Sequence, residues 1–277
     1  MGRALRRRLP ALLALALPVL AGLAFLHIGG APQHYLWGNA GALIIALLAA
    51  TVVAKPGSVL VRRVLVVALL AGLFAPLVTG PWLDGVARWI PVGPFRLHAA
   101  GLLLPSLLVL ALEDREYAPP ILLVAVIAGL LQPDAALGFT IVFATVGFHD
   151  VTKDWRIGVV TIIAFFAAMV MAVRGNPRPQ DFVENVLVDA AAISPVLAAV
   201  LFLALVASFF IILNAIPAPK AMRYTLAGCL FGFTILSIMA NYPSVLVGYG
   251  AAPILGFGFG LGLACAGPPE NSASRGD

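Results

Sequence analysis

The chain has 277 residues, of which 62% are hydrophobic and only 10% are charged. A soluble domain carries about 25% charged residues, so this composition excludes an ordinary soluble protein and indicates an integral membrane protein. The net charge of +5 does not indicate nucleic-acid binding, because membrane proteins gather Lys and Arg in their cytoplasmic loops.

Ten apolar runs follow one another along the chain, each long enough or nearly long enough to cross a membrane. They lie at 10–28, 37–54, 64–79, 99–112, 118–131, 135–149, 157–173, 193–215, 221–240 and 244–266. A transmembrane helix needs about 20 residues, with about 17 as a minimum. The runs at 99–112, 118–131 and 135–149 are the shortest and lie clearly below that minimum, and the last two of these could form one span kinked at Pro133.

The basic residues favour ten separate spans. With ten spans and the N-terminus inside the cell, thirteen of the seventeen Lys and Arg residues lie in cytoplasmic segments and four lie outside. Merging 118–149 into one span reverses the later segments and gives ten inside and seven outside. The positive-inside bias therefore predicts an all-α, polytopic membrane protein with about ten transmembrane helices and both termini in the cytoplasm.

The chain has no room for a soluble domain. We expect a single transmembrane domain over 1–267 and a short, polar, disordered cytoplasmic tail over 268–277. The basic and apolar N-terminal segment resembles a signal peptide, but with further spans after it we expect it to be retained as the first helix.

Two long external loops are predicted, at 80–98 and 174–192. In the second loop, the prolines of "NPRPQ" exclude a helix, and the spacing of apolar residues after them predicts an interfacial helix over 183–190. Asp181 would start that helix as its N-cap or in its first turn. Glu184, three residues on, would share its face.

The polar residues of these loops each have a plain structural interpretation beside a functional one. Arg88 in the first loop could do no more than reach lipid phosphates, and Asp134 in "QPDA" could simply cap the next helix. Asp181 could be only a helix cap. The sequence alone therefore leaves open whether the stretch 84–105 is one wall of a polar site or a loop between helices.

Two short motifs carry a resemblance to a known family. Arg88 and Trp89 precede the fourth apolar run, and "QPDAALG", which contains Asp134, follows the fifth. This pattern resembles the SEDS family (shape, elongation, division, sporulation), which includes RodA and FtsW. Its members have ten spans, an Arg-Trp before the fourth helix and a Gln-Pro-Asp-Leu-Gly-Thr after the fifth.

The second external loop extends the resemblance. The family pattern Thr-Asp-Phe-Ile-Phe-Ala-Val-Leu-Ala-Glu-Glu aligns without gaps on "QDFVENVLVDA", which places Asp181 on the family's catalytic aspartate. Near the C-terminus, Asn241, Tyr249 and Gly250 match further family positions. The chain departs from the family at 98–101, where "HAAG" replaces Gln-Pro-Ser-Glu, so it resembles a divergent, shortened member of the family.

The resemblance implies glycosyl transfer at the outer surface of a bacterial plasma membrane. The substrate would be the lipid-linked disaccharide-pentapeptide precursor of peptidoglycan, and a class B penicillin-binding protein is a possible partner besides the membrane lipids. Asp181 would take the proton of the attacking hydroxyl, or hold a divalent cation that does so; no other cofactor is expected. Arg88, Trp89, Asp134, Arg174 and Arg178 are the candidate substrate-binding residues.

Two other functions stay open. Because the glutamate of Gln-Pro-Ser-Glu is missing, the chain could be a catalytically inactive relative that binds the lipid precursor or scaffolds a cell-wall synthase. A small-solute transporter has less support, because transporters place ionisable residues at the middle of the membrane and these spans contain essentially none.

Overall fold

The computed structural model describes residues 2–93, 95–175 and 177–266, so the predicted tail at 268–277 lies outside the described residues. In this part of the chain the fold is helical apart from one short hairpin. The helices are α1 Gly2–Ile28, α2 Gln33–Val52, α3 Val59–Phe74, α4 Pro76–Thr79, α5 Ala99–Glu113, α6 Ala118–Leu131, α7 Ala135–Thr152, α8 Trp155–Arg174, α9 Val186–Ile193, α10 Pro195–Asn214, α11 Lys220–Met239 and α12 Ala251–Cys265; the strands are β1 Trp89–Val92 and β2 Phe95–His98.

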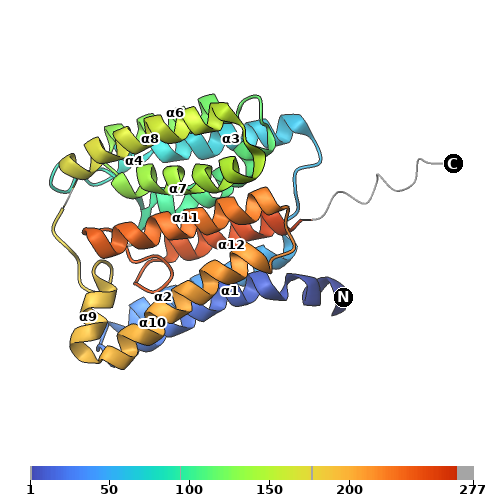
Figure 1. Ribbon diagram of the computed structural model, residues 1–277. Coiled ribbons are helices and arrows are strands. Elements are labelled where there is room, and N and C mark those ends of the chain that lie inside the picture. Colours follow the sequence, from blue (N-terminus) through green and yellow to red (C-terminus); the bar gives the residue numbers. More distant parts are fainter. Residues whose placement is uncertain (1, 94, 176, 267–277) are drawn as a thin grey trace.

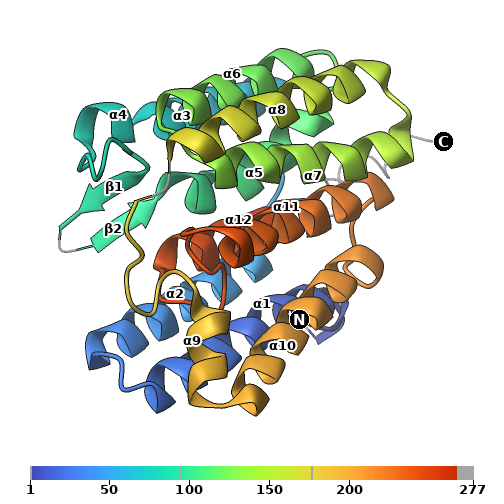
Figure 2. The ribbon, with the colours of Figure 1, turned by 60° about the vertical axis from the view of Figure 1, so that its left-hand side comes forward.

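The long helices run side by side in three groups (Figures 1 and 2). One group contains α3, α5, α6, α7 and α8, and another contains α1, α2 and α10, while α11 and α12 lie between them. Seven helices are long and apolar enough to cross a membrane, and α5, α6 and α12 are shorter apolar helices. The predicted all-α, polytopic fold with about ten transmembrane helices is confirmed.

The central helix α12 packs closely because it is rich in glycine. A Cβ added to Gly258 would lie 2.6 Å from the Cα of Ala46 on α2, and one added to Gly256 would lie even closer to the backbone of α5. Small residues at helix contacts are typical of membrane bundles, since they let backbones approach. Large apolar side chains are instead exposed on the outer faces of helices such as α3, α8 and α10, where lipid would cover them.

The stretch 118–149 forms two helices rather than one kinked helix. The chain reverses direction at Gln132–Asp134, between the end of α6 and the start of α7. The start of α6 lies close to the start of α8, because the charge of Glu116 acts on Arg156 and the charge of Arg115 acts on Asp154. The end of α7, which directly precedes α8, is therefore at the same end of the bundle as the start of α6. α6 and α7 are therefore antiparallel. This finding supports the ten-span prediction and rules out the merged span.

The bundle has two different ends. The start of α1 and the end of α2 meet where Arg8 donates a hydrogen bond to the carbonyl of Ala50, at 2.7 Å, and Gly262 near the end of α12 packs against the same turn of α2. We call this the basic end, and Figure 1 shows the start of α1 and the end of α12 there. The opposite, loop end contains the hairpin, α9 and the segments 177–185 and 240–250.

Two predictions at the loop end were wrong in detail. The last apolar run was expected to be helical from 244, but residues 243–250 form a loop and α12 begins at Ala251. The interfacial helix was expected over 183–190, but α9 spans Val186–Ile193 and Asn185, not Asp181, occupies its N-cap position. The first external loop contains the antiparallel β1–β2 hairpin, in which Trp89 pairs with His98, and α4 ends just before this loop.

Candidate functional site

Tyr242 in the loop between α11 and α12 holds three segments of the loop end together. Its hydroxyl accepts a hydrogen bond from the backbone N–H of Ala135 at 3.0 Å and donates one to the carbonyl of Gly175 at 2.9 Å. The side chain is 1% exposed, and burial raises the pKa of Tyr242 to about 12. The hydroxyl therefore keeps its proton and fixes the start of α7 against the end of α8.

Arg88 is buried completely beneath the outer surface of the loop end. Its guanidinium carbon lies 4.7 Å from the ring centroid of Trp89 and 4.5 Å from that of Tyr242, so the cation sits between two aromatic rings. Nη2 donates to the carbonyl of Asn241 at 3.1 Å, whereas Nε and Nη1 have no hydrogen-bond partner among the described residues. The interpretation of Arg88 as a lipid-facing residue is therefore wrong.

Asp134 is also completely buried and forms a pair with His98. Its Oδ1 accepts the backbone N–H of Leu137, which makes it the N-cap of α7, and its Oδ2 lies 3.0 Å from Nε2 of His98. Nδ1 of His98 accepts from the N–H of Gly101, so the ring proton is on Nε2 and is donated to the carboxylate. Burial alone would raise the pKa of Asp134, but His98 and then Arg88 more than offset it and lower that pKa.

The turn before α9 separates two carboxylates that were expected to lie on one helix face. Phe182 has a φ of 65°, in the left-handed region that bulky residues rarely adopt, and its ring packs on Phe25 and Tyr35 with centroids 6.0 and 6.4 Å away. Across this turn Asp181 is exposed, whereas Glu184 is 3% exposed. The predicted shared face of Asp181 and Glu184 is wrong, because neither residue is helical.

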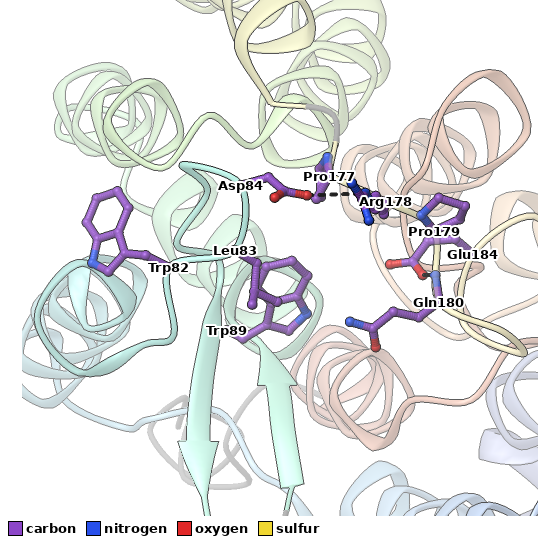
Figure 3. Close-up of a pocket in the computed structure, with 9 residues that line it drawn as sticks. All are labelled: Trp82, Leu83, Asp84, Trp89, Pro177, Arg178, Pro179, Gln180 and Glu184. Atoms are coloured by element: carbon purple, nitrogen blue, oxygen red, sulfur yellow. Dashed lines mark hydrogen bonds between the residues drawn. The ribbon is translucent and has the colours of Figure 1, made fainter.

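A cavity of about 380 Å³ lies between the first external loop and the segment 177–184 (Figure 3). Its volume is within the roughly 300–1,000 Å³ of small-molecule sites. The walls are formed by Trp82, Leu83, Asp84, Trp89, Pro177, Arg178, Pro179, Gln180 and Glu184. Oδ2 of Asp84 accepts the backbone N–H of Arg178 at 3.4 Å, which ties the two walls together at one side.

Glu184 forms the inner, buried part of this cavity wall. Its Oε2 accepts the backbone N–H of Gln180 at 2.7 Å, and its backbone pairs with Pro243. Burial raises the pKa of Glu184, while the Gln180 N–H and the charge of Arg88 act in the opposite direction. The cavity therefore has a carboxyl group that is more basic than an exposed one.

The residues predicted to form the site do not all meet. Trp89, 6% exposed, and Arg178 line the cavity; Arg88 lies behind Trp89. Asp134 is enclosed with His98, and Arg174 is exposed at the end of α8. Asp181 lies outside the cavity wall, near Asp189, whose pKa is raised by burial and by the charge of Asp181.

Sequence reasoning missed several residues of the site. Glu184 was treated as a surface residue, although its position four residues after Gln180 suits a hydrogen bond back to that backbone. His98 was noted only as the replacement for a family glutamine, and nothing in the sequence indicated its pairing with Asp134 across 36 residues. Asn241, which the resemblance did mark, bonds the carbonyl of Pro177 through its side chain.

The described residues do not form an obvious metal centre. Within 2–93, 95–175 and 177–266, no group of three or more His, Cys, Asp or Glu side chains comes together to hold an ion. Asp181 and Asp189 are the two acidic groups that act on one another at the surface, and two carboxylates do not complete the six or more oxygen ligands of a hard cation. The divalent cation stays a prediction.

The same arrangement of helices occurs in a known protein. The crystal structure of the rod shape determining protein RodA of Thermus thermophilus matches 91% of this chain and 93% of its own, with a TM-score of 0.65 and 20% sequence identity. A mutant form of that protein matches with a TM-score of 0.65 and 19% identity over 94% of its chain. The chain therefore has the fold of this RodA structure.

A sequence relative supports the SEDS resemblance, which is confirmed. The chain is 29% identical over 197 residues to a protein of Alkalilimnicola ehrlichii (strain ATCC BAA-1101 / DSM 17681 / MLHE-1) described as a probable peptidoglycan glycosyltransferase FtsW. The match covers 60% of this chain and 49% of the relative, so the chain spans about half the length of the curated relative that it matches. No family model matches the chain.

Proposed function

We propose that this chain is a SEDS-like membrane glycosyltransferase that polymerises the lipid-linked disaccharide-pentapeptide precursor of peptidoglycan. The observation that carries the proposal is the cavity of about 380 Å³ at the loop end, whose 177–184 wall holds the buried carboxyl group of Glu184 and the exposed Arg178. The RodA-like fold and the similarity to FtsW support the same function. The loop end then faces the outside of a bacterial plasma membrane.

The chemistry needs a base and a positive charge. A sugar 4-hydroxyl attacks an anomeric carbon, a carboxylate takes the proton of that hydroxyl, and the lipid diphosphate departs with the bonding electrons. Asp181 is the base that the resemblance proposes, and its exposed position at the outer surface leaves it accessible. Arg178 and Arg174 are exposed and free to contact a diphosphate, and charge-assisted hydrogen bonds would stabilise it.

Arg88 acts differently in this proposal. Its guanidinium is covered by Trp89 and Tyr242, so it contributes positive potential from behind the cavity wall rather than a direct clamp on the diphosphate. Asp134 likewise supports the site from within, since both of its oxygens are used by His98 and Leu137. A class B penicillin-binding protein is the proposed partner, and it would use the growing glycan chains.

A second function has an observation in its favour. The position of the family's buried glutamate is taken by Gly101, whose N–H bonds His98, and the cation of Arg88 is enclosed by aromatic rings. A relative that binds the lipid precursor or scaffolds a synthase, without catalysis, would need neither the missing glutamate nor an accessible Arg88.

One experiment separates the two functions. The purified protein in lipid vesicles is given the lipid-linked precursor, with and without a class B penicillin-binding protein, and glycan chains are separated on a gel. The proposal predicts glycan polymers from the wild-type chain. Binding of the labelled precursor without any polymer, in either mixture, would contradict it and favour the binding relative.

A further inference from the structure

Glu184 has the position that a proton acceptor in this cavity requires. The side chain lines the cavity wall yet is 3% exposed, and Oε2 is fixed by the N–H of Gln180. The second oxygen, Oε1, has no hydrogen-bond partner among the residues that the structure describes, and it is not among the atoms sealed from solvent. Figure 3 shows the carboxyl group directed into the space between Gln180 and Trp89.

The charged and titratable groups that face Glu184 come from both ends of the hairpin. Arg88 precedes β1 and contributes a positive charge, and His98 ends β2. Asp84 and Arg178 line the same cavity farther out. A buried carboxyl group beside a cation without an ion-pair partner can be ionised near neutral pH and still be a stronger base than an exposed carboxylate.

Asp181 lacks these features. It lies on the far side of the left-handed turn at Phe182, exposed to solvent and outside the cavity wall. The gapless alignment that places Asp181 on the family aspartate places Glu184 on a phenylalanine of the family pattern. The glutamate is therefore a feature of this chain that the resemblance does not supply.

We propose that Glu184 is the catalytic residue that accepts the proton of the attacking sugar hydroxyl in this chain. This inference rests on the proposed glycosyltransferase function. As the hydroxyl oxygen forms its bond to the anomeric carbon, the O–H proton moves to Oε1 of Glu184. The bond from that carbon to the diphosphate oxygen breaks, and the diphosphate leaves with the electron pair. No oxidant, reductant or further reactant is needed.

The test replaces the carboxylate while keeping the local hydrogen bond. Glu184→Gln retains an oxygen that can accept the Gln180 N–H, so the turn should stay folded. We expect its polymerisation rate to fall by about 100- to 10,000-fold, the usual effect of losing a general base, with an unchanged thermal midpoint in detergent. Glu184→Asp, which keeps a carboxylate, should retain more activity than Glu184→Gln. Glu116→Gln, the same change on an exposed residue at the basic end, is the control.

The dependence of kcat/KM on pH distinguishes a catalytic role of Glu184 from a structural one. Because burial raises the pKa of Glu184, the rate of the wild type should rise with pH through a carboxyl pKa above the ordinary glutamate value, and Glu184→Gln should lose that rise. A slow Glu184→Gln that keeps the wild-type pH profile would overturn the inference, as would one with the wild-type rate. A wild type that binds precursor but makes no polymer would overturn the proposed function itself, and this inference with it.

Discussion

Arg88 places a positive charge beneath two carboxyl groups whose pKa values move in opposite directions. His98 donates a hydrogen bond to Asp134, and His98 and Arg88 together lower the pKa of Asp134 although this residue is completely buried. Glu184 has a single backbone hydrogen bond, and burial raises its pKa. One cation thus supports an ionised structural carboxylate on one side and a more basic carboxyl group at the cavity on the other.

Asp134→Asn should destabilise the protein, and the effect should depend on pH. The change removes a charge-assisted hydrogen bond from His98, worth about 1.5–3 kcal/mol. Because the folded pKa is lowered, the ionised form stabilises the fold above the ordinary pKa of 3.8, and this contribution is lost as the pH falls through the folded pKa.

Thermal unfolding in detergent at a series of pH values would measure this difference. The gap between wild type and Asp134→Asn should be widest at neutral pH and should close under acid conditions. Asp189→Asn is the control, since the pKa of Asp189 is raised and its removal should not destabilise the protein at neutral pH. A gap that stays constant down to acid pH would mean that Asp134 acts as a neutral cap only.

At the scale of elements, the loop 240–250 positions the site more than any helix does. It bonds the turn before α9 at two points, from the N–H of Ser244 to the carbonyl of Val183 and from the N–H of Tyr249 to that of Phe182. The ring of Tyr249 also stacks on Tyr35 of α2 at 3.6 Å. The cavity wall that contains Glu184 is therefore held by contacts from α2 and this loop.

Tyr242→Phe tests that role. Without the hydroxyl, the buried N–H of Ala135 and carbonyl of Gly175 lose their partner, and an unsatisfied buried group costs about 1–3 kcal/mol. We expect a lower thermal midpoint in detergent and a reduced polymerisation rate, because the ends of α7 and α8 are no longer held together. Tyr117→Phe, at an exposed tyrosine of the basic end, should change neither property; equal midpoints for wild type and Tyr242→Phe would refute the role.

The helices were predictable from the sequence because a membrane span is set by a local quantity, the length of an apolar run. The predicted spans at 99–112 and 118–131 fall on α5 and α6 within one residue at each end. The loop end was not predictable in the same way. The start of α12 depends on hydrogen bonds between the Asn39 side chain and the backbone of Gly248 and Gly250. The burial of Glu184 depends on the left-handed turn at Phe182, whose ring packs on Phe25 of α1.

The candidate site shows the same limit. The resemblance indicated Arg88, Trp89 and Asp134 as important, and all three are buried at the loop end. Their partners could not be read from the sequence, because the ring of Tyr242 and the side chain of His98 reach them through tertiary contacts. A local pattern identifies a residue, but the three-dimensional contacts decide whether it supports the site or faces the cavity.

At the scale of the whole molecule, the two ends differ in charge. Ion pairs of the basic end include Lys55 with Glu113 and Arg63 with Asp114, and Arg156 bonds Asp154. At the loop end the basic residues are Arg88, Arg96, Arg174 and Arg178. Because positively charged loops stay in the cytoplasm, we predict that the basic end is cytoplasmic and the loop end is external.

Reporter fusions would measure that orientation. A reporter attached after Asp277 should be active only as a cytoplasmic protein, and one inserted in the turn of the β1–β2 hairpin should be active only outside. An external reporter at Asp277 would contradict the predicted topology and would move the cavity to the wrong side for an external precursor.

The most direct test of the central claim, that this chain catalyses glycan polymerisation at the loop-end cavity, is the polymerisation rate of a double variant. Asp181→Asn/Glu184→Gln removes both candidate bases and so does not depend on which of them accepts the proton. In vesicles with the lipid-linked precursor, we predict polymer from the wild type and a rate at least about 100-fold lower from a folded double variant. Equal rates for the two proteins would contradict the account, because the chemistry would then occur without either carboxylate.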